Sequence, residues 1–182
     1  MMSVRITKSG PTVSESAINT LELTLEHSLP PQYREFLLEF NGGEPETNVF
    51  PVDELGEGGV IEFFGIREGS VPGDIAFERS RMAGRVPSGL LPIAEAEGGN
   101  LVCVSLQGQD RGTVYFWDHE EEADEDAEPT YRNLHVIGSS FRDFWNSLRK
   151  FDPSQVELKE GQVEEAWIDP DLLRQLGDEE SV

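Results

Sequence analysis

The chain has 182 residues, of which 37% are hydrophobic and 27% are charged, a composition typical of one globular domain that excludes an extensively disordered chain. Its net charge of −22 repels the phosphates of nucleic acids and anionic lipid headgroups, so neither is expected as a partner, whereas a basic protein is favoured. Solubility alone is an alternative explanation for the same charge.

The cellular location is inferred from three features. The longest apolar runs, such as residues 101–106, are far shorter than the ~18 residues that indicate a membrane helix. Residues 1–5 do not begin a secretion-signal pattern. Cys103 is the single cysteine and lies in an apolar run, which predicts a buried structural thiol in a reducing compartment. We therefore expect a cytoplasmic protein.

Two helices are predicted near the N-terminus. The first extends from a cap at Ser14 to about Glu26, with an apolar face at residues 18, 21 and 25. The second follows Leu29, because Pro30 and Pro31 suit a first helical turn, where no N–H is needed. Its apolar stripe consists of Tyr33, Phe36, Leu37 and Phe40. The helix is expected to end at Asn41-Gly42-Gly43, which tolerate the left-handed backbone of a helix C-terminus.

The middle of the chain is predicted to form β-structure. The Gly-Glu-Gly-Gly sequence at 56–59 is interpreted as a turn, and not as a phosphate cradle, because no lysine follows it. Strands are predicted at 60–66, 91–94, 100–106 and 113–117, with a short helix near 73–82. The short connections between the last three strands favour antiparallel pairing.

A last strand is predicted at 134–137, before a helix that begins at Ser140 with Asp143 completing a variant of the capping box. Residues 1–150 are thus expected to form an α+β domain, in which helices pack against a mostly antiparallel sheet of about five or six strands. Residues 151–182 are predicted to form an acidic appendage, with a short docking helix from Asp169 to Gly177.

The order of these motifs resembles the SUKH superfamily, which includes the yeast cell-wall assembly regulator and many bacterial immunity proteins. The resemblance begins with Leu-Pro-Pro-Gln-Tyr-Arg-Glu-Phe-Leu at 29–37 and Asn-Gly-Gly at 41–43. It continues through 91–94, 98–100, 114–119 and 140–148, and so extends over roughly residues 14–150. The signature residues, which we expect to be structural, are Leu29, Pro30, Tyr33, Phe36, Leu37, Asn41, Gly42, Gly43, Gly99, Trp117 and Phe141.

The resemblance implies a non-enzymatic domain that, in bacteria, commonly neutralises a neighbouring polymorphic toxin, often a nuclease. We therefore expect an immunity protein that binds a basic toxin domain and needs no cofactor. A regulatory scaffold that recruits cellular proteins is the alternative, because relatives include such scaffolds and a fold does not fix a function.

The acidic run at 118–128 contains the candidate partner-binding residues. It has two interpretations, a solvated hairpin tip or an electrostatic surface for a basic toxin. Its spacing lacks the central glycine of an EF-hand, so calcium binding is not expected. The candidates are Asp118, Glu120, Glu121, Glu122, Asp124, Glu125, Asp126 and Glu128.

Other charged residues are expected to serve the fold. Asp118-His119-Glu120 would alternate between the faces of a strand and could not readily converge on one metal ion. The three histidines also lack the spacing of known metal motifs. The arginines of residues 67–85 are predicted to pair with carboxylates inside the domain, with a second contact patch as the alternative. These arginines are Arg67, Arg79, Arg81 and Arg85.

Overall fold

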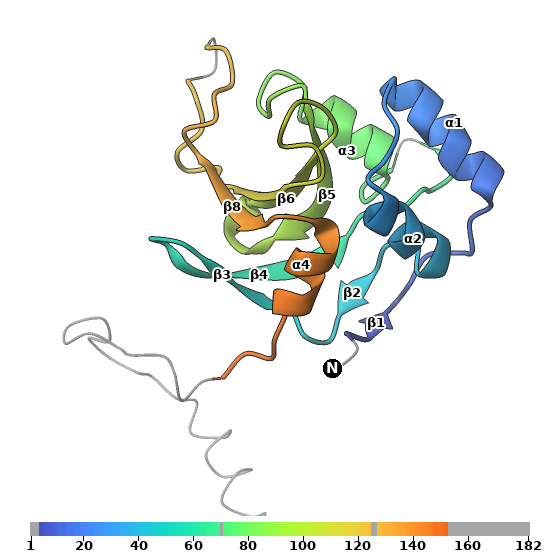
Figure 1. Cartoon of the computed structure of the whole chain (residues 1–182), viewed down its shortest axis with the longest axis horizontal. Helices are drawn as coiled ribbons and strands as arrows, with labels where there is room; N and C mark the ends of the chain where they lie inside the picture. The colour runs from blue at the N-terminus through green and yellow to red at the C-terminus, as the bar shows by residue number, and fades with distance from the viewer. Residues whose placement is uncertain (1–3, 70, 125–126, 153–182) are drawn as a thin grey trace, which may run out of the picture. The chain divides into compact units, whose positions relative to one another are not determined.

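The computed structural model describes residues 4–69, 71–124 and 127–152 (Figure 1), and the elements below all belong to the unit that ends at Phe151. The predicted appendage at 151–182 and its helix lie outside the described residues, apart from residues 151 and 152. In chain order the elements are β1 (Ile6–Thr7), α1 (Glu15–Leu25), α2 (Pro31–Glu39), β2 (Glu44–Pro45), β3 (Val49–Val52), β4 (Gly56–Phe63), α3 (Ile75–Arg81), β5 (Leu90–Ala96), a 3₁₀ turn (Glu97–Gly99), β6 (Leu101–Ser105), β7 (Val114–Trp117), β8 (Leu134–Gly138) and α4 (Phe141–Ser147).

Six strands form an antiparallel sheet in the order β3-β4-β5-β6-β7-β8, so each strand pairs with its neighbour in sequence. A separate two-stranded sheet joins β1 to β2. Helices pack against the larger sheet, with α3 on β5 and α4 on β8 (Figure 1). The prediction of an α+β domain with a mostly antiparallel sheet is therefore confirmed.

Side-chain caps fix the starts of α1, α3 and α4. Ser14, Asp74 and Ser140 each have extended backbone, and each side chain accepts a hydrogen bond from the N–H three residues later. These oxygens satisfy backbone donors that the first helical turn leaves without partners. The predicted caps at Ser14 and Ser140 are confirmed.

The end of α2 is fixed by its left-handed residues. Asn41, Gly42 and Gly43 have φ values of 51°, 86° and 112°, as the sequence predicted. A side chain at Gly42 would place its Cβ 2.6 Å from the carbonyl oxygen of Phe63. Glycine is therefore required here, because the end of α2 lies directly against β4.

Aromatic rings fill the core between the helices and the sheet. The centroid of the Phe36 ring lies 5.0 Å from that of the Phe63 ring, 5.2 Å from that of the Phe141 ring and 5.4 Å from that of the Trp145 ring. Cys103 is fully buried on β6, and this burial raises the pKa of its thiol. The structural role predicted for Cys103 is borne out, and Tyr33, Phe36 and Leu37 of the predicted apolar stripe are buried.

The interpretation of residues 56–59 as a turn was wrong. These residues belong to β4 and pair with β3, where Gly58 lies opposite Phe50. A Cβ atom on Gly58 would come within 2.7 Å of the Phe50 ring, so the glycine makes room for an aromatic side chain inside a strand. The chain reverses just before, between Val52 and Gly56.

The chain that follows α4 covers the outer edge of β3. Val49 N–H donates to the Arg149 carbonyl at 3.0 Å, and Arg149 N–H donates to the Val49 carbonyl at 2.9 Å. Strand edges without such partners can pair with other chains. The two hydrogen bonds therefore occupy backbone groups at which another strand could add.

Candidate functional site: an anchored acidic loop

Residues 118–133, which connect β7 to β8, form the acidic loop. Its two ends are clamped together, because Asp118 N–H donates to the Asn133 carbonyl at 2.9 Å and Asn133 Nδ2 donates to the Asp118 carbonyl at 2.7 Å. His119 N–H donates to Asn100 Oδ1 at 3.0 Å, which fixes the loop to the turn after β5. Gly99 in that turn has a φ of 81°, and a Cβ there would lie 3.2 Å from the His119 ring.

A third contact joins the first part of the loop to the connection between α3 and β5. Arg85 Nε donates to Glu122 Oε2 at 2.9 Å and Arg85 Nη2 donates to Glu122 Oε1 at 2.7 Å, a bidentate pair. The hydrogen bonds from Arg85 hold the pKa of Glu122 below its usual value, and those with Glu122 raise the pKa of Arg85. The same guanidinium lies over the ring of buried Trp117, at 5.4 Å from its centroid.

Four other described carboxylates of the loop face solvent and have no ion pair among the described residues. In the described part of the loop, Glu122 has an ion pair, whereas Glu120, Glu121, Asp124 and Glu128 are exposed and have none. Asp118 is half-buried and accepts a hydrogen bond from Glu120 N–H at 2.9 Å. The remaining two candidates, Glu125 and Asp126, lie outside the described residues.

The loop folds around an open hollow. Among the described residues that line it, five are acidic and one, Arg132, is basic. A lysine or arginine side chain entering the hollow would meet Glu120, Glu121, Asp124 and Glu128, which have no ion pair among the described residues, so charge-assisted hydrogen bonds can form there. The arrangement can therefore bind a basic group of another molecule.

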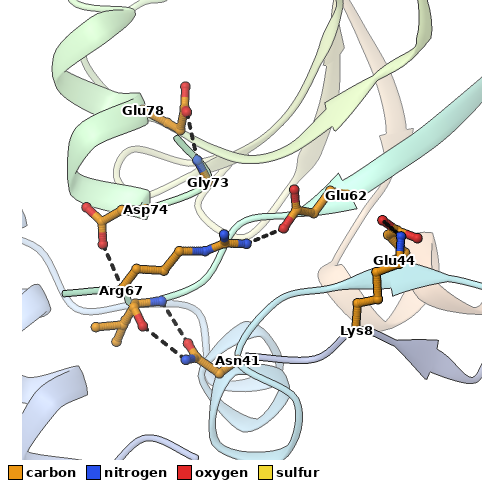
Figure 2. A network of polar contacts seen from close by, with 9 residues as sticks. Lys8, Asn41, Glu44, Glu62, Arg67, Gly73, Asp74 and Glu78 are labelled. Atoms are coloured by element: carbon orange, nitrogen blue, oxygen red, sulfur yellow. Dashed lines mark hydrogen bonds and ion pairs between the residues drawn. The ribbon is translucent and has the colours of Figure 1, made fainter. Parts of the chain in front are cut away.

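The polar network in Figure 2 is a contrasting case, because its groups satisfy one another. Asn41 is 2% exposed, and its Nδ2 donates to the carbonyls of Pro11 and Ile66 at 2.9 and 3.0 Å. Asn41 Oδ1 accepts from Ile66 N–H at 2.7 Å. This side chain joins the end of α2 to the chain after β4, so its role is structural.

The same network contains Arg67, which pairs with Glu62 of β4. Its backbone N–H donates to Asp74 Oδ2 at 2.9 Å, while the other oxygen of Asp74 caps α3. Buried Glu78 accepts from Gly73 N–H at 3.0 Å and pairs with Arg81. These charges neutralise one another and hold the segment between β4 and α3.

The predicted internal pairing of the arginines holds for Arg67, Arg81 and Arg85. Arg79 differs, since its Nη1 donates to the Leu25 carbonyl at 3.5 Å and not to a carboxylate. Pairing within the domain therefore accounts for most of this basic region, and the acidic loop uses one of its members as an anchor.

A groove between α2 and α4 is a second surface feature. Its floor includes Phe40 and Trp145, whose rings stack with centroids 6.0 Å apart. On its rim, Arg142 pairs with Glu35 at 3.4 Å. With Glu39 also in its lining, the groove carries one net negative charge, against four in the hollow of the acidic loop.

The described residues contain neither a cluster suited to a metal ion nor a membrane-crossing helix. In residues 4–69, 71–124 and 127–152, no three side chains of His, Cys, Asp or Glu gather as they would around a metal ion. No helix in these ranges has the length and apolarity needed to cross a membrane.

The sequence matches the SMI1 / KNR4 family (SUKH-1) over residues 12–147, a span that contains every element from α1 to α4 and the whole acidic loop. The chain belongs to this family. It is also 26% identical over 174 residues to the SPbeta prophage-derived uncharacterized protein YokK of Bacillus subtilis (strain 168), with 86% of this chain and 84% of that protein covered. The resemblance to SUKH proteins is thereby confirmed.

The signature residues of the SUKH resemblance lie mostly inside the domain. Ten of the eleven are buried, and Gly99 is the exposed one, in the turn that meets His119. The buried ones are Leu29, Pro30, Tyr33, Phe36, Leu37, Asn41, Gly42, Gly43, Trp117 and Phe141. Their positions are those of residues that maintain the fold, while the described candidate binding residues are exposed or half-buried.

Sequence reasoning missed the anchor of the acidic loop. Arg85 and Glu122 are 37 positions apart, and no local spacing indicates that they meet. The one available signal was a basic residue near the end of a predicted helix, in a chain with few basic residues.

Proposed function

We propose that this SUKH-1 protein is a cytoplasmic immunity protein that acts by binding, without catalysis, and that neutralises a basic toxin domain. The observation that carries the proposal is the acidic loop, in which four exposed carboxylates have no ion pair among the described residues, while the ends of the loop are already fixed. Membership of the SUKH-1 family supports it, because that family includes toxin-immunity proteins.

We propose further that the toxin is a nuclease. A nuclease must attract a polyanionic substrate, so its substrate site is basic. An inhibitor with clustered carboxylates can occupy the same region, and its charge accelerates the encounter between the two proteins. The net charge of −22 acts in the same direction over a longer range.

The proposal is tested by co-expressing the protein with the toxin domain encoded in the neighbouring gene. Host survival reports neutralisation, and purified components report binding and inhibition of DNA or RNA cleavage. Rescue together with specific binding is the expected result. If a correctly folded protein neither binds nor protects, the proposal fails, and the alternative of a regulatory scaffold is favoured.

A charge-matched pair of variants tests the role of the loop. In one variant Glu120, Glu121 and Glu128 become Gln and Asp124 becomes Asn. In the control, exposed acids elsewhere receive the same changes, namely Glu39→Gln, Glu68→Gln, Glu95→Gln and Asp53→Asn. The loop variant should lower the association rate about tenfold at low salt, and the control should lower it much less. Equal effects would mean that net charge, and not the loop, attracts the partner.

A further inference from the structure

One face of β7 and β8 carries a small group of side chains, one of which comes from the acidic loop. Tyr115 and Val136 are direct partners in the antiparallel register, so their side chains project from the same face. The ring of Tyr131, near the end of the acidic loop, meets that of Tyr115 edge to face, with centroids 6.4 Å apart and planes at 78°. We refer to Tyr115, Tyr131 and Val136 as the tyrosine patch.

The tyrosine patch lies where this face of the sheet changes from buried to exposed. Cys103 on β6 is the register partner of Tyr115 and is fully buried. One strand further, Val136 is 55% exposed, and Tyr131 is exposed to the same extent. A single exposed apolar side chain is ordinary, but a pair set against an oriented aromatic ring is a feature of binding surfaces.

The patch is held in place before any partner binds. Tyr115 Oη donates to Asp110 Oδ2 at 2.9 Å, and partial burial together with this contact raises the pKa of Tyr115 to about 12. Tyr115 therefore stays neutral and fixed, and Tyr131 rests against it. A tyrosine held in this way loses little conformational entropy when it is buried in an interface.

The acidic loop lies on the same face as the patch. Tyr115 and Trp117 are two positions apart on β7, so their side chains point in the same direction. Arg85 covers Trp117 and holds Glu122, while Tyr131 meets Tyr115. Glu122 from the first part of the loop and Tyr131 from the last part therefore both lie on this face. A molecule that is attracted by the carboxylates thus also reaches the tyrosines.

We propose that the tyrosine patch is the apolar centre of the surface on which the basic toxin domain docks, with the exposed carboxylates Glu120, Glu121, Asp124 and Glu128 as its charged rim. The inference rests on the proposed function and adds a division of roles to it. Charges at a rim set the rate of encounter, whereas a buried aromatic anchor sets the rate of dissociation. An arginine-rich surface fits best, because a guanidinium pairs with carboxylates and also stacks on a tyrosine ring.

The experiment measures association and dissociation rates of the full-length protein on the toxin domain used in the survival assay. Tyr131→Ala and Val136→Thr remove the exposed apolar groups. Ile61→Thr on β4 and Leu23→Ala on α1 are matched controls, since these side chains are 46% and 79% exposed. Thermal unfolding of each variant verifies that it is folded.

We expect Tyr131→Ala to raise the dissociation rate about tenfold and to leave the association rate within about twofold, as for a hot-spot residue. Tyr131→Phe keeps the ring and should retain slow dissociation. The proposed role of the tyrosine patch is overturned if Tyr131→Ala and Val136→Thr dissociate at the same rates as the two controls. If the loop variant still slows association in that case, the proposed function stands without it. A wild-type protein that does not bind the toxin domain overturns both.

Discussion

The guanidinium of Arg85 lies 5.4 Å from the ring centroid of Trp117 and at the same time holds both carboxylate oxygens of Glu122. Arg85 thus connects the acidic loop to a side chain that is 1% exposed. Because the ring restricts the guanidinium, the ion pair should be worth more than an ordinary surface pair.

We predict a measurable coupling between Arg85 and Glu122. Arg85→Met and Glu122→Gln should each lower the free energy of unfolding, and the coupling energy from the double variant should be about 0.5–1 kcal/mol. Urea unfolding of the four proteins in this cycle gives the value. The control cycle uses Arg142 and Glu35, whose side chains are 66% and 67% exposed, and its coupling should be close to zero. Equal couplings in the two cycles would contradict a special role for the Trp117 contact.

A second prediction concerns Asn41. Asn41→Ala should lower the free energy of unfolding by about 2–4 kcal/mol, because it removes three hydrogen bonds from a buried site and places alanine at a φ of 51°. Glycine adopts a φ of 51° without steric cost, so Asn41→Gly should be less destabilising than Asn41→Ala. The difference is the smaller part of the loss, because the three hydrogen bonds are absent from both variants. Asn19→Ala is the control, since Asn19 is exposed and makes one hydrogen bond to Arg34. Chemical denaturation measures all three, and equal costs at 41 and 19 would refute the structural role.

A third prediction tests the glycine in β4. Gly58→Ala should cost about 1–3 kcal/mol, because the new methyl group would overlap the ring of Phe50, which lies 2.7 Å from the Cβ position. Combining it with Phe50→Leu should cost less than the sum of the two single changes, since the smaller side chain leaves room for the methyl group. Thermal and urea unfolding report both effects. Strict additivity would show that the two positions do not compete for space.

A fourth prediction concerns alkaline pH. Burial raises the pKa of Cys103 above its ordinary value of 9.0, so the unfolded chain loses this proton at a pH where the folded protein retains it. The stability from this group is therefore fully present below pH 9 and is lost as the pH rises toward the folded pKa, by up to about 1.4 kcal/mol per pH unit. Denaturant unfolding from pH 8 to pH 10 measures the slope.

The matched variants for the alkaline slope are Cys103→Ala and Tyr33→Phe. Cys103→Ala removes the group and should flatten the slope between pH 9 and pH 10. Tyr33 is also buried with a raised pKa, but its ordinary pKa is 10.0, so Tyr33→Phe should alter the slope mainly at higher pH. If Cys103→Ala leaves the slope between pH 9 and pH 10 unchanged, another group is responsible for it.

The helices could be predicted from sequence because their signals are local. The caps at Ser14 and Ser140, and the left-handed end of α2 at Asn41, depend on residues within one helical turn. The strands β2 and β3 were missed, because Pro45 and Pro51 lie within them and weaken the β pattern. Their pairing depends on partners that local reasoning does not reveal.

The error at residues 56–59 has a similar cause. Glycines in sequence usually indicate a turn, but Gly58 is needed because the ring of Phe50 lies against it from the neighbouring strand. For the candidate site, charge density placed the acidic loop between two predicted strands, and the structure has it there. The anchor by Arg85 and the contact of Tyr131 with Tyr115 required the tertiary structure.

The clamp between Asp118 and Asn133 has a consequence for how this protein can diverge. Once the ends of a connection are fixed, lengthening it costs little, because the entropy of loop closure grows only slowly with length. Insertions and substitutions between the two clamp residues would leave the register of β7 and β8 unchanged. Related proteins could thus change their binding partner through substitutions and insertions between Asp118 and Asn133 alone, while the residues of the core stay the same.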